Sequence, residues 1–338
     1  KTQSTAPAKP SAAPAPAAPG AVDDLLALFP SADLIAVVDA NRLVNELLPR
    51  LAEIETGGLN KLAKQISDFT TKTGIIPAKV TNAVLGFQME GTEGSGAVVV
   101  SGLDLSPSQI EAAMKEFKAE FKTLDYKGKT IFSLVSKEKK PEAGPVVVKT
   151  DETALAALGN QRFVLGDLKV VQQVIDISGG TAKGNLSPTM VAALKETRSS
   201  ALLRFALNVP ESLKKGAADQ GDLFKSVNTV QVVLGTFDIA NDFSMALDAI
   251  MRTTSQKDAA ELEEGLKGLV SLVKGIFGGA NNDPKMEALG QLLDQIKIGS
   301  KQSDVSLSIT LPRATLDQLT KKSAPADAKK PAPAEKKP

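Results

Sequence analysis

VTNAVLGFQMEGTEGSGAVVVSGLD occupies residues 80–104 and has the pattern of a β-hairpin. Apolar residues are concentrated in 80–90 and in 96–104, and the five residues between them, from Gly91 to Ser95, are typical of a loop. Two strands that are joined by so short a loop pair in antiparallel fashion. The stretch therefore predicts an antiparallel sheet.

A helix is expected directly after this hairpin. Ser106 supplies an N-cap, Pro107 occupies the first helical position, and Gln109 completes a capping box. The apolar residues behind the cap fall on one helical face, namely Ile110, Ala113, Met114, Phe117 and Phe121. Around this unit we predict a buried strand at 33–40, helices at 41–56, 58–73 and 167–178, and strands at 129–136, 145–149 and 161–166.

The second part of the chain repeats this plan. Residues 200–208 match 32–40, residues 227–252 match the hairpin, the helix at 255–278 matches the one at 106–121, and residues 297–311 match 125–136. We therefore predict an α+β protein made of two similar halves, residues 21–180 and 181–320. Each half is expected to be an antiparallel sheet with helices packed on one face.

The two ends of the sequence differ from the rest in composition. Residues 1–20 and 321–338 are Pro/Ala/Lys tracts with little to bury, so disordered tails are predicted. The tails have net charges of +2 and +4, and subtracting them from the total of +1 leaves −5 for residues 21–320. Basic tails of this kind predict contact with components of a cell envelope.

Missing residue types exclude several kinds of chemistry. The sequence has no Cys, no His and no Trp, and its one tyrosine is Tyr126. Nucleophile–base pairs that use Cys or His, and the usual zinc, copper, haem and iron–sulfur ligands, are therefore absent. We expect no catalytic residue, no cofactor and no metal, and hence no enzyme.

Charge and hydropathy indicate which partners and which cellular compartment the sequence favours. A net charge of +1 argues against nucleic-acid binding, and no apolar run approaches the roughly 20 residues of a membrane span. Lack of Cys suits an oxidising compartment. Because the sequence begins with Lys1, we expect an exported protein whose signal peptide has been removed, located in the periplasm, the cell envelope or the extracellular space.

Two short patterns resemble functional motifs. Gly128-Lys129-Thr130 resembles the end of a phosphate-binding loop, but Thr123 occupies the position where that motif needs glycine, so a turn is predicted. The acids Asp39, Asp104 and Asp248 lie near predicted strand ends, where a cleft could gather a carboxylate pair. Turn and cap roles are the commoner use of such residues.

The helix predicted at 255–278 has the most distinctive apolar stripe. It comprises Leu262, Leu266, Leu269, Val273, Ile276 and Phe277, with Lys267 and Lys274 beside it. We expect this stripe to pack on the sheet of its own half. The alternative is a face for an apolar ligand, a lipid surface or a partner helix, formed by Leu266, Leu269, Val273 and Phe277.

Several segments resemble a group of known proteins. FPSADLIAVVDANRL at 29–43, the hairpin, YKGKTIFSL at 126–134 and QRFVLGDLKVVQQVID at 161–176 are similar to uncharacterised secreted bacterial proteins classed as domains of unknown function. The resemblance implies export and a duplicated α+β unit. It implies no catalytic residue, and the Cys of a lipid anchor is missing.

Three functions are compatible with these features. The first is a non-enzymatic exported or envelope protein with a structural or interaction role. The second is a carrier of an apolar ligand or lipid, and the third is a carboxylate-based hydrolase. A solid core favours the first, a dry apolar cavity the second, and two facing acids in a cleft the third.

Overall fold

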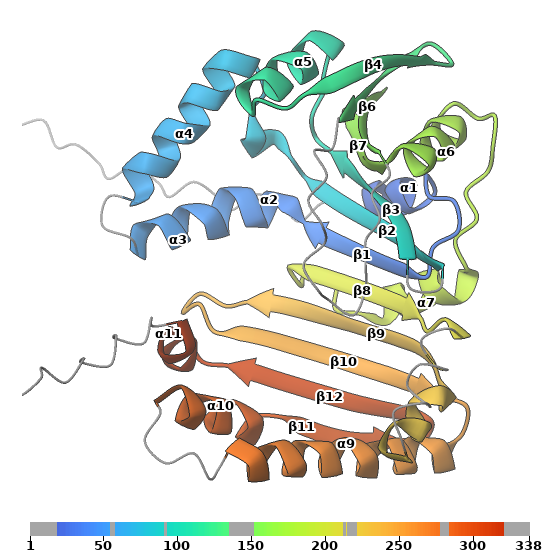
Figure 1. Ribbon diagram of the computed structural model, residues 1–338, viewed down its shortest axis with the longest axis vertical. Helices are drawn as coiled ribbons and strands as arrows, with labels where there is room; N and C mark the ends of the chain where they lie inside the picture. Colours follow the sequence, from blue (N-terminus) through green and yellow to red (C-terminus); the bar gives the residue numbers. More distant parts are fainter. Residues whose placement is uncertain are drawn as a thin grey trace, which may run out of the picture.

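The structure, a computed structural model, describes residues 19–54, 58–90, 93–134, 152–211, 214, 222–277 and 284–320 (Figure 1). The predicted tail at 321–338, residues 1–18 of the other tail, and the predicted strand at 145–149 lie outside these residues. Pro19 and Gly20, which we assigned to the first tail, begin a helix instead.

One antiparallel sheet of twelve strands forms the centre of the described chain. Its order is β11-β12-β10-β9-β8-β1-β2-β3-β7-β6-β5-β4. The strands are β1 (Leu34–Asp39), β2 (Asn82–Glu90), β3 (Glu93–Ser101), β4 (Phe121–Tyr126), β5 (Lys129–Leu134), β6 (Thr153–Gly159), β7 (Arg162–Asp167), β8 (Leu203–Asn208), β9 (Val230–Ile239), β10 (Met245–Thr253), β11 (Lys297–Lys301) and β12 (Asp304–Leu311).

The helices connect these strands, and their bounds agree with most of the predicted ranges. They are α1 (Pro19–Leu26), α2 (Ala40–Arg42), the π-helical turn η1 (Leu43–Leu47), α3 (Leu48–Ile54), α4 (Gly58–Thr73), the 3₁₀ turn η2 (Pro77–Lys79), α5 (Pro107–Glu116), α6 (Leu168–Ser178), α7 (Pro188–Glu196), the 3₁₀ segment η3 (Asp222–Thr229), α9 (Gln256–Phe277), α10 (Pro284–Asp294) and α11 (Arg313–Thr320).

The two predicted halves share this sheet. Strand β1 pairs with β2 on one side and with β8 on the other, with Leu34 opposite Leu207. Outward from the β1–β8 pair, the strand order of the first half begins as β1-β2-β3 and that of the second half as β8-β9-β10. The first half then continues as β7-β6-β5-β4, whereas the second continues as β12-β11. The α+β class is confirmed, whereas two similar halves are not.

The hairpin at 80–104 is confirmed, but its loop is shorter than predicted. Strand β3 begins at Glu93, so Gly94 and Gly96 belong to the strand. A Cβ at Gly94 would lie 2.2 Å from the ring of Phe87, and one at Gly96 would lie 2.6 Å from the carbonyl oxygen of Gly86. These glycines therefore leave space for the Phe87 ring and for the neighbouring backbone. The prediction that Gly94 belongs to a loop did not foresee this packing role.

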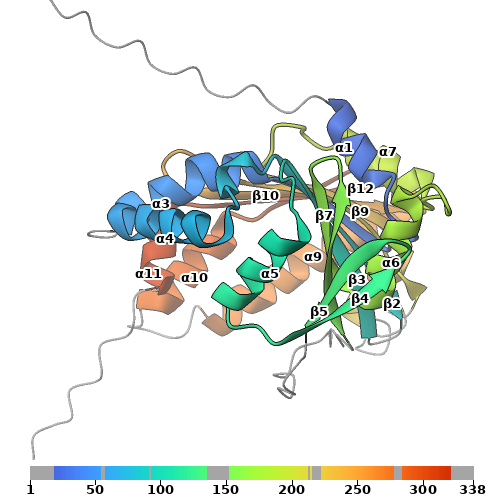
Figure 2. The same cartoon turned by 90° about the horizontal axis from the view of Figure 1, so that it is seen from above.

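Helices cover both faces of the sheet, which corrects the prediction of one covered face. Within β6, Ala154 and Ala156 pack in the core that includes α1, α6 and α7, whereas Leu155 between them packs against Ile110 and Met114 of α5. Successive side chains of a strand point to opposite faces, so α5 and α6 lie on opposite sides. Figure 2 shows α1, α6 and α7 on one side and α3, α4 and α10 on the other.

Helix α5 has the predicted capping box, with Ser106 and Gln109 bonded reciprocally. Its apolar stripe ends earlier than predicted. The helix stops at Glu116, Lys118 takes a left-handed φ of 53°, and Phe121 begins β4. Phe117 is consequently 71% exposed, where we expected a side chain covered by the sheet.

Phe243 joins three segments that are far apart in sequence. The guanidinium groups of Arg50 in α3 and Arg313 in α11 both lie over its ring, each 5.3 Å from the ring centroid. Arg50 also donates a hydrogen bond of 2.6 Å to Asn241 Oδ1. Phe243 is 9% exposed and has a φ of 63°, a conformation that costs a non-glycine residue energy. The turn between β9 and β10 thereby fixes α3 and α11 at the end of the sheet (Figure 1).

Candidate functional site

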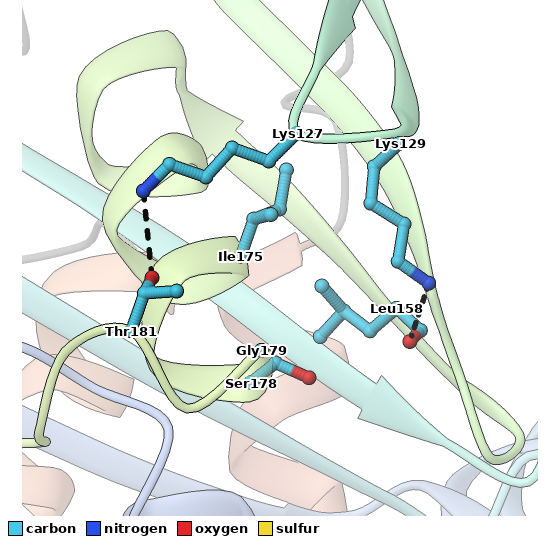
Figure 3. A pocket seen from close by; sticks show the side chains of 7 residues that line it. All are labelled: Lys127, Lys129, Leu158, Ile175, Ser178, Gly179 and Thr181. Carbon is cyan, nitrogen blue, oxygen red and sulfur yellow. Dashed lines mark hydrogen bonds between the residues drawn. The ribbon is translucent and has the colours of Figure 1, made fainter.

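A cavity of about 250 Å³ lies between the β4–β5 turn and the last turn of α6. Two lysines flank it in Figure 3, with apolar side chains of β6 and α6 between them. Its lining comprises Lys127, Lys129, Leu158, Ile175, Ser178, Gly179 and Thr181. The cavity is therefore mixed in character, with ammonium and hydroxyl groups around an apolar part.

The turn that presents the lysines follows from the local sequence. Tyr126 pairs with Lys129, so Lys127 and Gly128 form a two-residue connection, with φ values of 51° and 75°. Positive φ at both positions defines a type I′ turn, which glycine adopts easily. The predicted turn is confirmed at Gly128, whereas Lys129 and Thr130 already belong to β5.

Lys127 belongs to a hydrogen-bonded charge network. Its Nζ lies 2.6 Å from Asp176 Oδ1, and the hydroxyl of Tyr126 donates to Asp176 Oδ2 at 3.1 Å. The Lys127 hydrogen bond, helped by that of Tyr126, lowers the pKa of Asp176. The same bond raises the pKa of Lys127. Both groups stay charged near neutral pH, so neither is suited to general acid–base catalysis there.

Lys129 has a different environment. Its Nζ donates to the carbonyl oxygen of Leu158 at 3.1 Å, and its side chain is half-buried. Within the described ranges this ammonium forms no ion pair with a carboxylate. The cavity therefore has two ammonium groups and one carboxylate, that of Asp176, at its edge.

A second cavity, of about 140 Å³, lies near the other end of α6. It is lined by Phe29, Pro30, Ser31, Gly86, Gln88, Ser95, Gly96, Lys169, Val170 and Gln173. Most of its polar side chains are exposed or half-buried. At its wall, the ring of Phe29 packs against Gly86, only 2.4 Å from where a Cβ would lie.

The apolar stripe of α9 is divided between two environments. Leu262 is 2% exposed, and Leu266 packs with it against Val305 of β12. Leu269 and Val273 are half-buried, and Leu272 beside them is 57% exposed. The side chain of Phe277 lies outside the described part. The first half of the stripe therefore packs on the sheet as expected, and the role of Leu266, Leu269, Val273 and Phe277 as a ligand face stays a prediction.

Two of the three candidate carboxylates, those of Asp39 and Asp248, are not brought together. Asp39 caps α2 by accepting from the backbone N–H of Arg42 at 2.9 Å, and Asp248 accepts from Ser308 at 2.7 Å. Asp104 is exposed between β3 and α5. Three strand spacings separate β1 from β10, which is about 14 Å. Carboxyl pairs of glycosidases are about 5–9.5 Å apart, so Asp39 and Asp248 do not form such a pair.

Sequence reasoning missed a group of exposed apolar side chains on neighbouring elements. We call them the α3–α5 patch, and they are Leu48 (37% exposed), Leu51 (42%), Ile76 (40%) and Phe117 (71%). Helix α4 contacts both α3 and α5, and the ring of Phe117 lies 5.8 Å from that of Phe69 in α4. Phe117 belongs to this set because α5 ends before its predicted stripe does.

The described residues contain no group of three or more His, Cys, Asp or Glu side chains that could hold a metal ion. No helix among them is long and apolar enough to cross a membrane.

Comparison with known proteins gives structural likeness only. No family model and no curated protein matches the chain. Solved structures similar to it include crystal forms III, I and IV of TP0453, with TM-scores of 0.47, 0.43 and 0.39. Each is 8% identical in sequence to this chain. The match to form III covers 87% of this chain and 96% of the TP0453 chain. At these TM-scores the likeness carries no argument about function.

Proposed function

We propose that the chain is a non-enzymatic, exported protein of the cell envelope, which binds an anionic membrane surface without crossing it. The observation that supports this is the α3–α5 patch, where four large apolar side chains are exposed on neighbouring elements. We infer that these side chains act as one surface, because contiguous apolar exposure marks interaction sites, whereas single exposed residues are common on any surface.

The apolar contribution depends mainly on Phe117. Fully burying a Phe or Leu side chain is worth roughly 1.5–3 kcal/mol, and Phe117 has most of its surface available. Lipid headgroups and acyl chains can cover such a ring without a shaped partner pocket. Leu48, Leu51 and Ile76 would add smaller contributions, since each already has more than half of its surface covered.

Charge supports the same partner. Residues 321–338 have a net charge of +4 and follow α11, which Phe243 connects to α3 through Arg313 and Arg50. Arg313, at the start of α11, therefore lies close to the helix that contains Leu48 and Leu51. Each Lys near an anionic membrane is worth about 1 kcal/mol, so apolar and basic elements together suffice for reversible attachment.

Flotation with lipid vesicles tests the proposal. Wild type should float with phosphatidylglycerol vesicles and much less with phosphatidylcholine vesicles. Phe117→Ser should lower the bound fraction, whereas Leu272→Ser, which changes an exposed leucine of α9, should not. No flotation with either lipid, or equal losses in the two variants, would refute a membrane role for the patch.

The other functions have less support. The cavity beside α6 has two lysines in its lining, so it is not the dry apolar space that a lipid carrier needs. The hydrolase hypothesis needs two facing acids, and the placement of Asp39 and Asp248 does not favour it.

We also propose that the shared orders β1-β2-β3 and β8-β9-β10 derive from a duplication, with units near 21–180 and 181–320.

A further inference from the structure

We propose that the cavity between the β4–β5 turn and α6 binds an oxyanion of the phosphate type. The cavity lies on the α6 side of the sheet, whereas α5 and its exposed Phe117 lie on the other side. This inference therefore does not depend on the membrane proposal.

Unused hydrogen-bond donors around the cavity provide the first argument. An ammonium group has three N–H donors. Lys129 uses one for the Leu158 carbonyl, and Lys127 uses two for Asp176 and Thr181. Two donors of Lys129 and one of Lys127 thus remain, and the described residues provide no partner for the hydroxyl of Ser178. A tetrahedral anion, which accepts several hydrogen bonds at once, matches this set.

Charge provides the second argument. Lys127 and Asp176 compensate each other at 2.6 Å, while Lys129 has no carboxylate partner among the described residues. The surplus charge at the cavity is therefore positive. Because Lys129 is half-buried and bonded to a carbonyl, its ammonium is held in place, and less entropy is lost when an anion binds.

The C-terminal end of α6 does not cancel this surplus. Free carbonyl groups at a helix end repel anions. Here the carbonyl oxygens of Ile175 and Ile177 accept from Gly179 and Gly180, and that of Asp176 accepts from Thr181. Three of the last four carbonyl groups are thus bonded to backbone N–H groups, which weakens the repulsion that this helix end exerts on an anion.

The size of the cavity bears on the source of the anion. About 250 Å³ exceeds the space that a phosphate ion needs, and the remainder adjoins the side chains of Leu158 and Ile175. A free phosphate ion and a phosphate group on a small organic molecule both satisfy the donors. Contact of an organic part with the two apolar side chains would favour the second source.

Two titrations test the proposal, one with inorganic phosphate and one with glycerol 3-phosphate. Binding is followed by the chemical shifts of the amide groups in NMR spectra. A salt concentration of about 0.15 M screens the surface charge. Wild type should show saturable shifts at Ser178, Gly179 and Thr181. Lys129→Gln should weaken binding about tenfold, as loss of a charge-assisted hydrogen bond implies. Lys122→Gln, an exposed lysine of β4 outside the lining, should leave binding unchanged.

Tighter binding of glycerol 3-phosphate would identify a phosphorylated molecule, and equal binding would identify the free ion. Ser178→Ala should weaken binding without lowering the melting temperature, which keeps the test valid if Lys129→Gln disturbs the turn. No saturable shift with either probe, or the same loss in the Lys122→Gln variant, would overturn the proposal. Neither result bears on vesicle flotation, so the two proposals fail independently.

Discussion

Replacing Phe243 tests whether the turn between β9 and β10 holds α3 and α11 in place. Two substitutions separate the contributions of the ring. Phe243→Leu keeps most of the apolar volume but removes the π-face that the guanidinium groups of Arg50 and Arg313 contact. Phe243→Ala removes both the volume and the π-face. The left-handed φ of 63° is strained in all three proteins, so its cost cancels in the comparison.

The expected magnitudes follow from these contacts. A guanidinium over an aromatic ring contributes about 0.5–1 kcal/mol at an exposed site, so two of them give about 1–2 kcal/mol for Phe243→Leu. Truncating a buried Phe to Ala costs about 3–5 kcal/mol. Since Phe243 is 9% exposed and lies in a turn, we expect about 3 kcal/mol for Phe243→Ala, near the lower limit.

Urea denaturation followed by circular dichroism measures these losses as changes in the free energy of unfolding. Arg313→Met, alone and with Phe243→Leu, completes a double-mutant cycle whose coupling energy should be about 0.5–1 kcal/mol. A Phe243→Leu variant as stable as wild type, with no coupling to Arg313, would show that the stacked arrangement contributes nothing to stability.

Three further outcomes are expected. Leu262→Ala should lower the free energy of unfolding, measured in urea, by about 2–5 kcal/mol. Leu272 is 57% exposed on the same helix, so Leu272→Ala should change that free energy by less than about 0.5 kcal/mol. Similar losses in the two variants would contradict the packing of α9. In NMR titrations, Lys127→Met should raise the lowered pKa of Asp176 more than Tyr126→Phe does, and the reverse order would be inconsistent with the hydrogen-bond ranking. Because the folded pKa is lowered, the stability that Asp176 contributes is present above its unfolded pKa and is lost as pH falls through the folded value. EDTA should leave the melting temperature unchanged, and a clear drop would reveal an oxygen-ligand site.

Local features of the fold were predictable from the sequence. The capping box at Ser106 and the hairpin at 80–104 depend on residues that are neighbours in the chain, and both are confirmed. The stripe through Phe117 and Phe121 failed because helical periodicity says nothing about where a helix ends. Lys118 takes a left-handed conformation, for which Lys carries no sequence signal.

Long-range features were not predictable in the same way. The pairing of β1 with β8 and the cover on both faces depend on which strands become neighbours, and periodicity within one strand does not specify its partner. The candidate cavity shows the same limit. The turn at Gly128 was predicted, but Asp176 is 49 residues from Lys127, and nothing in the sequence connects the two.

The pairing of β1 with β8 also determines the order in which the chain can complete its sheet. At about 5–20 residues per second, a ribosome adds β8 roughly ten to thirty seconds after β1. Until then one side of β1, whose sequence is LIAVVD, is an unpaired apolar edge. Such edges template aggregation. A delay in folding until residue 208 has been added would therefore protect the nascent chain from aggregation. A bound chaperone, or transport in an unfolded state, would provide such a delay.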